Sequence, residues 1–184
     1  MKTKMLIMII ALLGISTMSY AQKYITKTGH IRFYSEAPLE NIEAHNKQVN
    51  SAFNAETGDF VFRLLMKSFE FEKALMQEHF NENYVHSDKF PNATFVGKVV
   101  NAGDIDFDNK GEHEVVVKSE LTIHGVTKEI ETTGNFITGG EQITGESVFN
   151  IELDDYDVEI PGTVSNNISN TIEITVKVDL KKVE

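Results

Sequence analysis

The chain has 184 residues, no cysteine, three prolines and a formal net charge of −11. This length suits one domain with a sizeable core, and the lack of cysteine excludes disulfides, a thiol nucleophile and a thiolate metal site. Nucleic acids and anionic lipid headgroups bind to positively charged surfaces, so the acidic charge disfavours both as partners.

Residues 1–21 are typical of a secretory signal peptide. A basic start precedes an apolar run over residues 5–15, which is too short to span a bilayer comfortably, and small residues lead up to Ala21. We expect cleavage near Ala21 and export from a bacterial cytoplasm, so that the mature protein is periplasmic or secreted. An N-terminal membrane anchor is the alternative. A lipoprotein anchor is excluded because it needs a cysteine.

After this segment, apolar and polar residues alternate in about eight stretches bounded by turn residues. The alternation predicts strands over residues 24–34, 42–53, 60–66, 93–100, 112–123, 126–137, 143–153 and 168–180. Between the third and fourth strands the spacing changes and predicts a short helix over residues 72–80. A helix this short does not persist alone, so we expect it to pack on the sheet.

Eight antiparallel strands in one domain predict an all-β fold, an eight-stranded antiparallel barrel with one short helix. Closure into a barrel removes exposed strand edges. A barrel of this size can just hold one small ligand. A two-sheet sandwich remains the alternative, because alternation alone does not separate the two architectures.

No residue pattern predicts catalysis or metal binding. The six histidines lack metal-ligand spacing, and no nucleophile elbow, phosphate loop or dinucleotide fingerprint occurs. The acidic loop over residues 104–111 resembles a calcium loop, but it lacks Gly at the sixth position and Glu at the twelfth. We interpret it, and the acidic residues 154–157, as solvated turns, with surface calcium left open at the second. We predict no catalytic residue, no metal and no cofactor.

Phenylalanine is concentrated between Phe60 and Phe95, which span seven of the 12 in the chain. Such residues either fill a solid core or line a cavity for a hydrophobic ligand, and the two uses have the same composition. The candidates for inward-facing, ligand-binding side chains are Phe60, Phe62, Leu64, Phe69, Phe71, Leu75, Met76, Phe80, Phe95, Phe149 and Ile151.

The most distinctive sequence motif is Leu-Thr-Ile-His-Gly-Val-Thr-Lys over residues 121–128, where two alternating segments meet at Gly125. It resembles a signature of the YceI-like family, leucine-threonine-hydrophobic-histidine-glycine-valine-threonine-lysine. Residues 79–84, the proline-containing 89–95 and 149–158 resemble further family segments in the same order. The chain departs from the family in having no tryptophan and in placing an aspartate where a glycine is usual, at Asp157.

The resemblance implies that residues 22–184 form a lipocalin-like, lipid-binding barrel with an apolar tunnel. Its partner would be a hydrophobic small molecule such as a polyisoprenoid, a quinone or a fatty-acid-like lipid, and the resemblance leaves a homodimer open. We expect an exported binding protein, not an enzyme, that sequesters or carries this lipid. The alternatives are a structural or stress-related barrel module without a ligand, and an enzyme that uses an acid–base pair in the same cavity.

Overall fold

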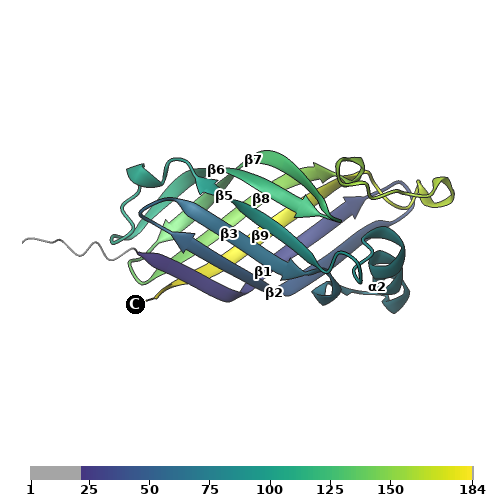
Figure 1. Cartoon of the computed structure of the whole chain (residues 1–184), viewed down its shortest axis with the longest axis horizontal. Coiled ribbons are helices and arrows are strands. Elements are labelled where there is room, and N and C mark those ends of the chain that lie inside the picture. Colours follow the sequence, from purple (N-terminus) through teal and green to yellow (C-terminus); the bar gives the residue numbers. More distant parts are fainter. Residues whose placement is uncertain (1–21, 184) are drawn as a thin grey trace, which may run out of the picture.

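Eight long strands form the wall of the molecule in the computed structural model, which describes residues 22–183 (Figure 1). They are β1 (Lys23–Glu36), β2 (Asn41–Asn54), β3 (Asp59–Leu65), β5 (Asn92–Val99), β6 (Gly111–Ile123), β7 (Val126–Thr138), β8 (Gln142–Glu152) and β9 (Thr171–Val183). All neighbours are antiparallel, in the order β1-β9-β8-β7-β6-β5-β3-β2, and pairing of β1 with β2 closes the ring. The predicted lipocalin-like barrel is therefore confirmed, and the sandwich alternative is wrong. The segment predicted as a signal peptide lies outside the described residues.

Short elements occupy the connections between the long strands. The two-residue β4 (Glu70–Phe71) pairs with β2, and α2 (Ala74–His79) continues into a π-helical turn, η2 (Phe80–Tyr84). The 3₁₀ turns are η1 (Met66–Ser68), η3 (Ala102–Asp104), η4 (Leu153–Tyr156) and η5 (Gly162–Val164). Within residues 22–183, no helix has the length and apolar character needed to cross a bilayer.

Two predicted starts differ from the structure by more than one residue, for local reasons. The helix begins at Ala74 instead of residue 72, because Lys73 is still extended, with φ −109° and ψ 124°. The last strand begins at Thr171 instead of residue 168. The backbone N–H of Ser169 donates to the side-chain hydroxyl of Ser35 in β1 at 2.9 Å, and that of Thr171 donates to the hydroxyl of Ser169 at 3.2 Å, so neither joins a backbone ladder.

The alternation along each strand separates the barrel interior from its surface. In β3, Phe60, Phe62 and Leu64 are buried, whereas Val61 and Leu65, which alternate with them, are exposed. Successive side chains of a strand point to opposite faces, so a closed ring turns every second residue toward a common interior. The core of the molecule is this interior.

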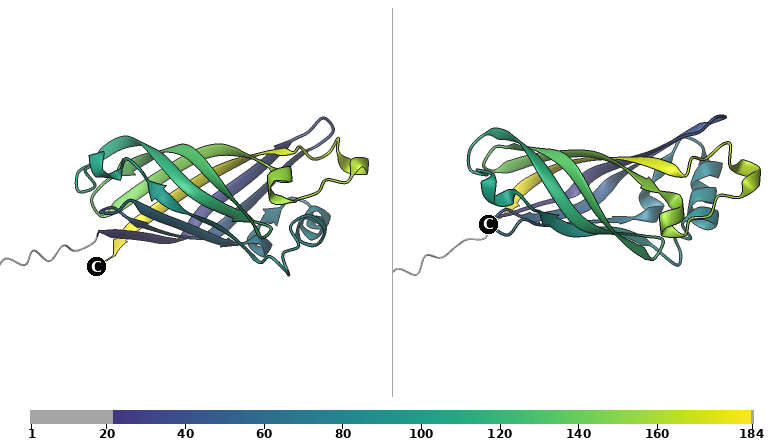
Figure 2. Two further views of the ribbon diagram at one scale, coloured as in Figure 1. Left: turned by 45° about the horizontal axis from the view of Figure 1, so that its top comes forward. Right: turned by 90° about the horizontal axis from the view of Figure 1, so that it is seen from above.

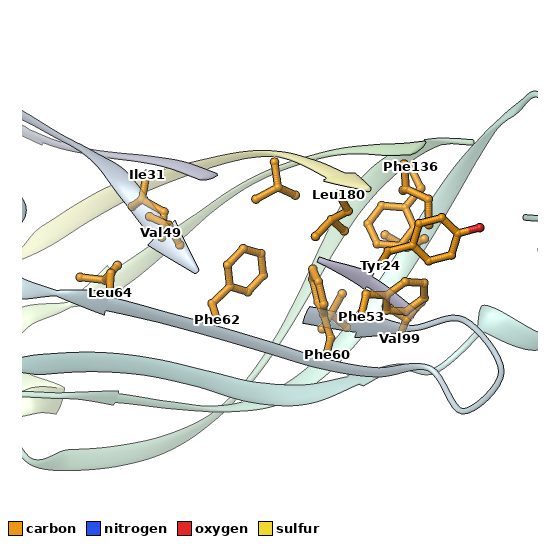
Figure 3. Packing of buried hydrophobic residues seen from close by; sticks show 14 of the residues in the cluster. Tyr24, Ile31, Val49, Phe53, Phe60, Phe62, Leu64, Val99, Phe136 and Leu180 are labelled. Atoms are coloured by element: carbon orange, nitrogen blue, oxygen red, sulfur yellow. The ribbon is translucent and has the colours of Figure 1, made fainter. Parts of the chain in front are cut away.

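The two ends of the barrel are built differently. α2 and the long β8–β9 connection lie at one end, and the C-terminus lies at the other (Figure 2). At the C-terminal end, Tyr24, Phe53, Phe60 and Phe136 gather inside the ring (Figure 3). The loop before β6 adds the buried Phe107 to them, while its acidic residues stay exposed. We call the end with α2 the mouth and the aromatic end the base.

The β6–β7 hairpin turns at the mouth through His124 and Gly125 alone. Ile123 pairs with Val126 across a two-residue loop, and the φ angles of His124 and Gly125 are +52° and +79°. Two positive φ angles are typical of a type I′ turn, whose twist matches that of the flanking strands. His124 also lies 2.8 Å from His86 and 3.1 Å, through Nδ1, from the carbonyl oxygen of Tyr156, so the turn is tied to two neighbouring loops.

The backbone pairing between β7 and β8 is incomplete. β7 and β8 pair from Thr138–Ile143 to Asn135–Glu146, near the base, whereas β6 pairs with β7 along its whole length. Beyond that point the hydroxyl of Ser147 donates to the carbonyl oxygen of Thr133 at 2.6 Å and lies 3.3 Å from the hydroxyl of Thr132. We call this junction, from Gly134 and Ser147 toward the mouth, the seam.

We predict that Gly125→Ala destabilises the protein by about 1–3 kcal/mol, because a side chain at positive φ is strained. A Cβ atom at Gly125 would also come within 2.5 Å of the Phe90 ring. The measurement is the free energy of unfolding in urea. Gly103→Ala is the matched control, since a Cβ there meets nothing within 4 Å. Equal stability of the two variants would contradict the prediction.

Tyr156 makes the stability sensitive to alkaline pH. Its side chain is 2% exposed, and burial, followed by the charge of Asp155, raises the pKa of its phenol from 10.0 to about 12. Between these values the unfolded chain releases the phenol proton while the folded protein keeps it. The free energy of unfolding therefore falls as the pH rises from 10 to 12, and the contribution is complete only below pH 10.

We accordingly expect Tyr156→Phe to lose less stability than the wild type as the pH is raised, although the variant starts from a different stability at neutral pH. Urea unfolding at pH 9, 10 and 11 measures the difference. Parallel curves for the two proteins would show that Tyr156 is not the group responsible.

Candidate functional site

The barrel interior is not packed solid but holds an apolar cavity of about 410 Å³. Inward-facing side chains from all eight long strands form most of its wall, with Ile42 as the contribution of β2, and residues of α2 and η2 complete it at the mouth. Among the described residues that line it, none is Lys or Arg. A cavity of this size and composition suits the apolar part of one small ligand.

Ten of the eleven predicted cavity residues line this space: Phe60, Phe62, Leu64, Phe69, Phe71, Met76, Phe80, Phe95, Phe149 and Ile151. They come from β3, β4, β5, β8 and the segment around α2, so the fold brings together side chains that lie up to 91 positions apart. Their contact with a ligand remains a prediction.

Leu75 is the exception, and its predicted place in the cavity is wrong. Its side chain is 61% exposed and does not line the space. Met76, His79 and Phe80 do line it, and their spacing of three and four residues places them on one face of the helical segment. Leu75 precedes this face and points to solvent, because α2 docks through the opposite side.

Several residues that line the cavity were not among those predicted from the sequence. Phe33 of β1, Val115 and Val117 of β6, Phe136 of β7 and the β9 residues Ile172, Ile174, Val176 and Val178 all line the cavity. The alternation in β9 is plain in the sequence and could have identified its inward face once a barrel was assumed. Phe33 shares the face of Ile31 in the predicted strand 24–34 and could have been identified in the same way, whereas Phe136 is followed directly by Ile137, so the inward face of that strand is ambiguous in the sequence.

A cluster of four aromatic rings narrows the mouth. Phe33 lies 5.3, 5.5 and 5.5 Å from Phe69, Phe71 and Phe80, measured between ring centroids, and Phe71 lies 5.1 Å from Phe80. Tilted and edge-on pairs at these distances are favourable beyond the area that they bury. The cluster attaches the α2 segment to β1 and β4 and makes it a wall of the cavity.

Polar side chains line the cavity mainly at its rim. At the mouth these are Ser35, Glu40, His79 and Asn167. Glu40 accepts a hydrogen bond from Lys73 at 2.6 Å, and Ser35 accepts one from the backbone N–H of Ser169. At the seam, Glu146 pairs with Lys177 at 3.1 Å. Each of the two carboxylates that reach the cavity is thus paired with a lysine that does not line it. Among the described residues that line the cavity, no lysine or arginine could pair with an anionic headgroup.

Two stacked histidine pairs lie outside the cavity. The ring nitrogens of His30 and His45 are 3.0 Å apart, and those of His86 and His124 are 2.8 Å apart. Strand register and loop packing create these pairs, so sequence spacing gave no sign of them. Across residues 22–183, no three histidine or acidic side chains are grouped so that they could hold a metal ion.

Solved structures share the fold. A polyisoprenoid-binding domain from Saccharophagus degradans superposes with a TM-score of 0.77 at 16% identity, over 89% of this chain and 99% of that one. BcnA from Burkholderia cenocepacia gives 0.67 at 15% identity, over 83% and 95%, and a YCEI protein from Campylobacter jejuni gives 0.61 at 18% identity, over 81% and 90%.

The sequence itself identifies the family. No curated protein matches the chain significantly. The family profile described as the YceI-like domain matches residues 22–180, almost the whole of the barrel. This match includes the hairpin signature over residues 121–128 and the cavity walls on both sides of it. The chain therefore belongs to the YceI-like family.

Proposed function

We propose that this protein is an exported binding protein that sequesters or carries a long-chain lipid, such as a polyisoprenoid, a quinone or a fatty acid, in the barrel cavity. The observation that carries the proposal is a cavity of about 410 Å³ with almost entirely apolar walls inside a closed ring. The family and the similarity to a polyisoprenoid-binding domain support a binding role over an enzymatic one.

Binding would follow from the transfer of apolar chain atoms out of water. Each buried CH₂ group contributes about 0.8 kcal/mol, so a chain of ten or more carbons gives strong binding without any polar contact. No residue performs covalent chemistry in this account. A cavity between the side chains also argues against the alternative of a purely structural module, whose core would gain stability from side chains that fill it.

Native mass spectrometry of the protein purified from its own cells tests the proposal. We expect a bound species of defined mass that organic extraction removes. The polypeptide mass in the same spectrum reports cleavage after Ala21, and the charge-state series reports whether a homodimer forms. Repeated purification without a bound species, together with failure to bind added long-chain lipids, would refute the binding function.

We further predict that Met76→Glu weakens binding of a long-chain fatty alcohol about tenfold or more, because it places a carboxylate on the cavity side of the mouth. Leu75→Glu is the matched control on the same helix, where the side chain is exposed to solvent. Titration of both variants with the same alcohol measures the effect. Equal affinities would show that the mouth is not the route or the site of binding.

A further inference from the structure

We propose that the cavity binds one chain of about 16 carbons, and that Phe60 and Phe136 form a floor that sets this limit. The inference rests on the proposed lipid-binding function and adds a ligand class to it: lipids with a single chain of roughly three isoprene units or a 16-carbon acyl length. A much longer polyisoprenoid would leave most of its chain outside.

The floor is a double layer of aromatic rings. Phe60 and Phe136 both line the cavity, with ring centroids 6.1 Å apart. Phe53 lies directly behind them, 5.5 and 5.4 Å from the two rings, and does not line the cavity. Figure 3 shows these three rings gathered at the base, with Phe62 and Leu64 farther along the interior.

The base is closed behind these rings as well. Tyr24 and Phe107 pack on Phe53, and the hydroxyl of Tyr24 donates to the carbonyl oxygen of Gly140 at 2.8 Å. Both rings are buried, and close-packed interiors leave no passage for a chain. A ligand that enters at the mouth must therefore end at Phe60 and Phe136.

Side-chain hydrogen bonds narrow the seam where it meets the floor, and the exposed Glu146 lines the cavity at this place. Ser147 donates to the carbonyl oxygen of Thr133 at 2.6 Å, and its hydroxyl lies 3.3 Å from that of Thr132. Below this point β7 and β8 are fully paired. The hydrogen-bonded hydroxyls bridge the two strands where the backbone ladder ends.

The volume of the cavity gives the chain length. An apolar cavity of about 150 Å³ holds benzene, which corresponds to about 25 Å³ per carbon. At that density the 410 Å³ cavity holds about 16 carbons. Carbons beyond this number stay in water and add nothing to the affinity, whereas each carbon within it tightens binding about fourfold.

Substitutions in a row of three residues can make the cavity either deeper or shallower. Phe136, Gly145 and Val178 are paired across β7, β8 and β9, and all three line the cavity. A Cβ atom at Gly145 would lie 3.1 Å from both Phe136 and Val178, closer than ordinary contact. Gly145→Ala therefore forces these two cavity-lining side chains to shift, and we expect the added bulk to shorten the cavity beside the floor. Phe136→Leu instead removes part of the floor.

The test is a native mass spectrometry titration of delipidated protein with straight-chain alcohols of about 10 to 24 carbons and an isoprenoid alcohol of about 40 carbons. For the wild type we expect affinity to rise with chain length and to level off near 16 carbons. We call the chain length at which the affinity levels off the break. It should move to longer chains by about two to four carbons in Phe136→Leu and to shorter chains in Gly145→Ala. Val148→Ala, which alters an exposed side chain of β8, should leave it unchanged.

The outcomes separate this inference from the function on which it rests. Affinity that keeps rising to 24 carbons, or that is highest for the 40-carbon alcohol, would overturn the length limit and leave lipid binding intact. A break that stays in place in folded Phe136→Leu, verified by its thermal unfolding, would overturn the role of the floor. If no alcohol of any length binds, the proposed function fails together with the inference.

Discussion

The hydrogen-bonded closure of β1 on β2 is the constraint on which the rest of the structure depends. β1 pairs with β9 on one side and with β2 on the other, so a sheet that would otherwise have two free ends becomes a ring. Only in a ring do the inward faces of all strands meet around one space. The burial of apolar side chains and the cavity both follow from that closure.

Aromatic rings gather at the two ends of the cavity, and the wall between them carries Phe62, Phe95 and aliphatic side chains. Phe53, Phe60 and Phe136 occupy the base, and Phe33, Phe71 and Phe80 surround the mouth. Gly134, and Gly145 beside Phe136 of the floor, line the same space and contribute no side chain to it.

The sequence predicts most of the strands and of the cavity wall, because alternation reports directly which side chains share a face. The sequence does not decide between a barrel and a sandwich. The two folds differ in whether β1 pairs with β2, and the alternation in these two segments would be the same in both. The sequence misplaces Leu75, because the buried face of a six-residue helix is set by docking and not by its own periodicity. The pairing of His30 with His45 depends on strand register, which no local pattern encodes.

The incomplete ladder at the seam has a consequence for the solution behaviour of the protein. Toward the mouth, β7 and β8 each present backbone groups that are not paired with the other strand, and unpaired strand edges attract further strands and promote aggregation. Glu129 and Glu131 stand exposed on this part of β7. Glu131 pairs with Lys118 at 3.2 Å, which leaves the carboxylate of Glu129, on a chain with a net charge of −11, to disfavour the approach of the same edge of a second copy.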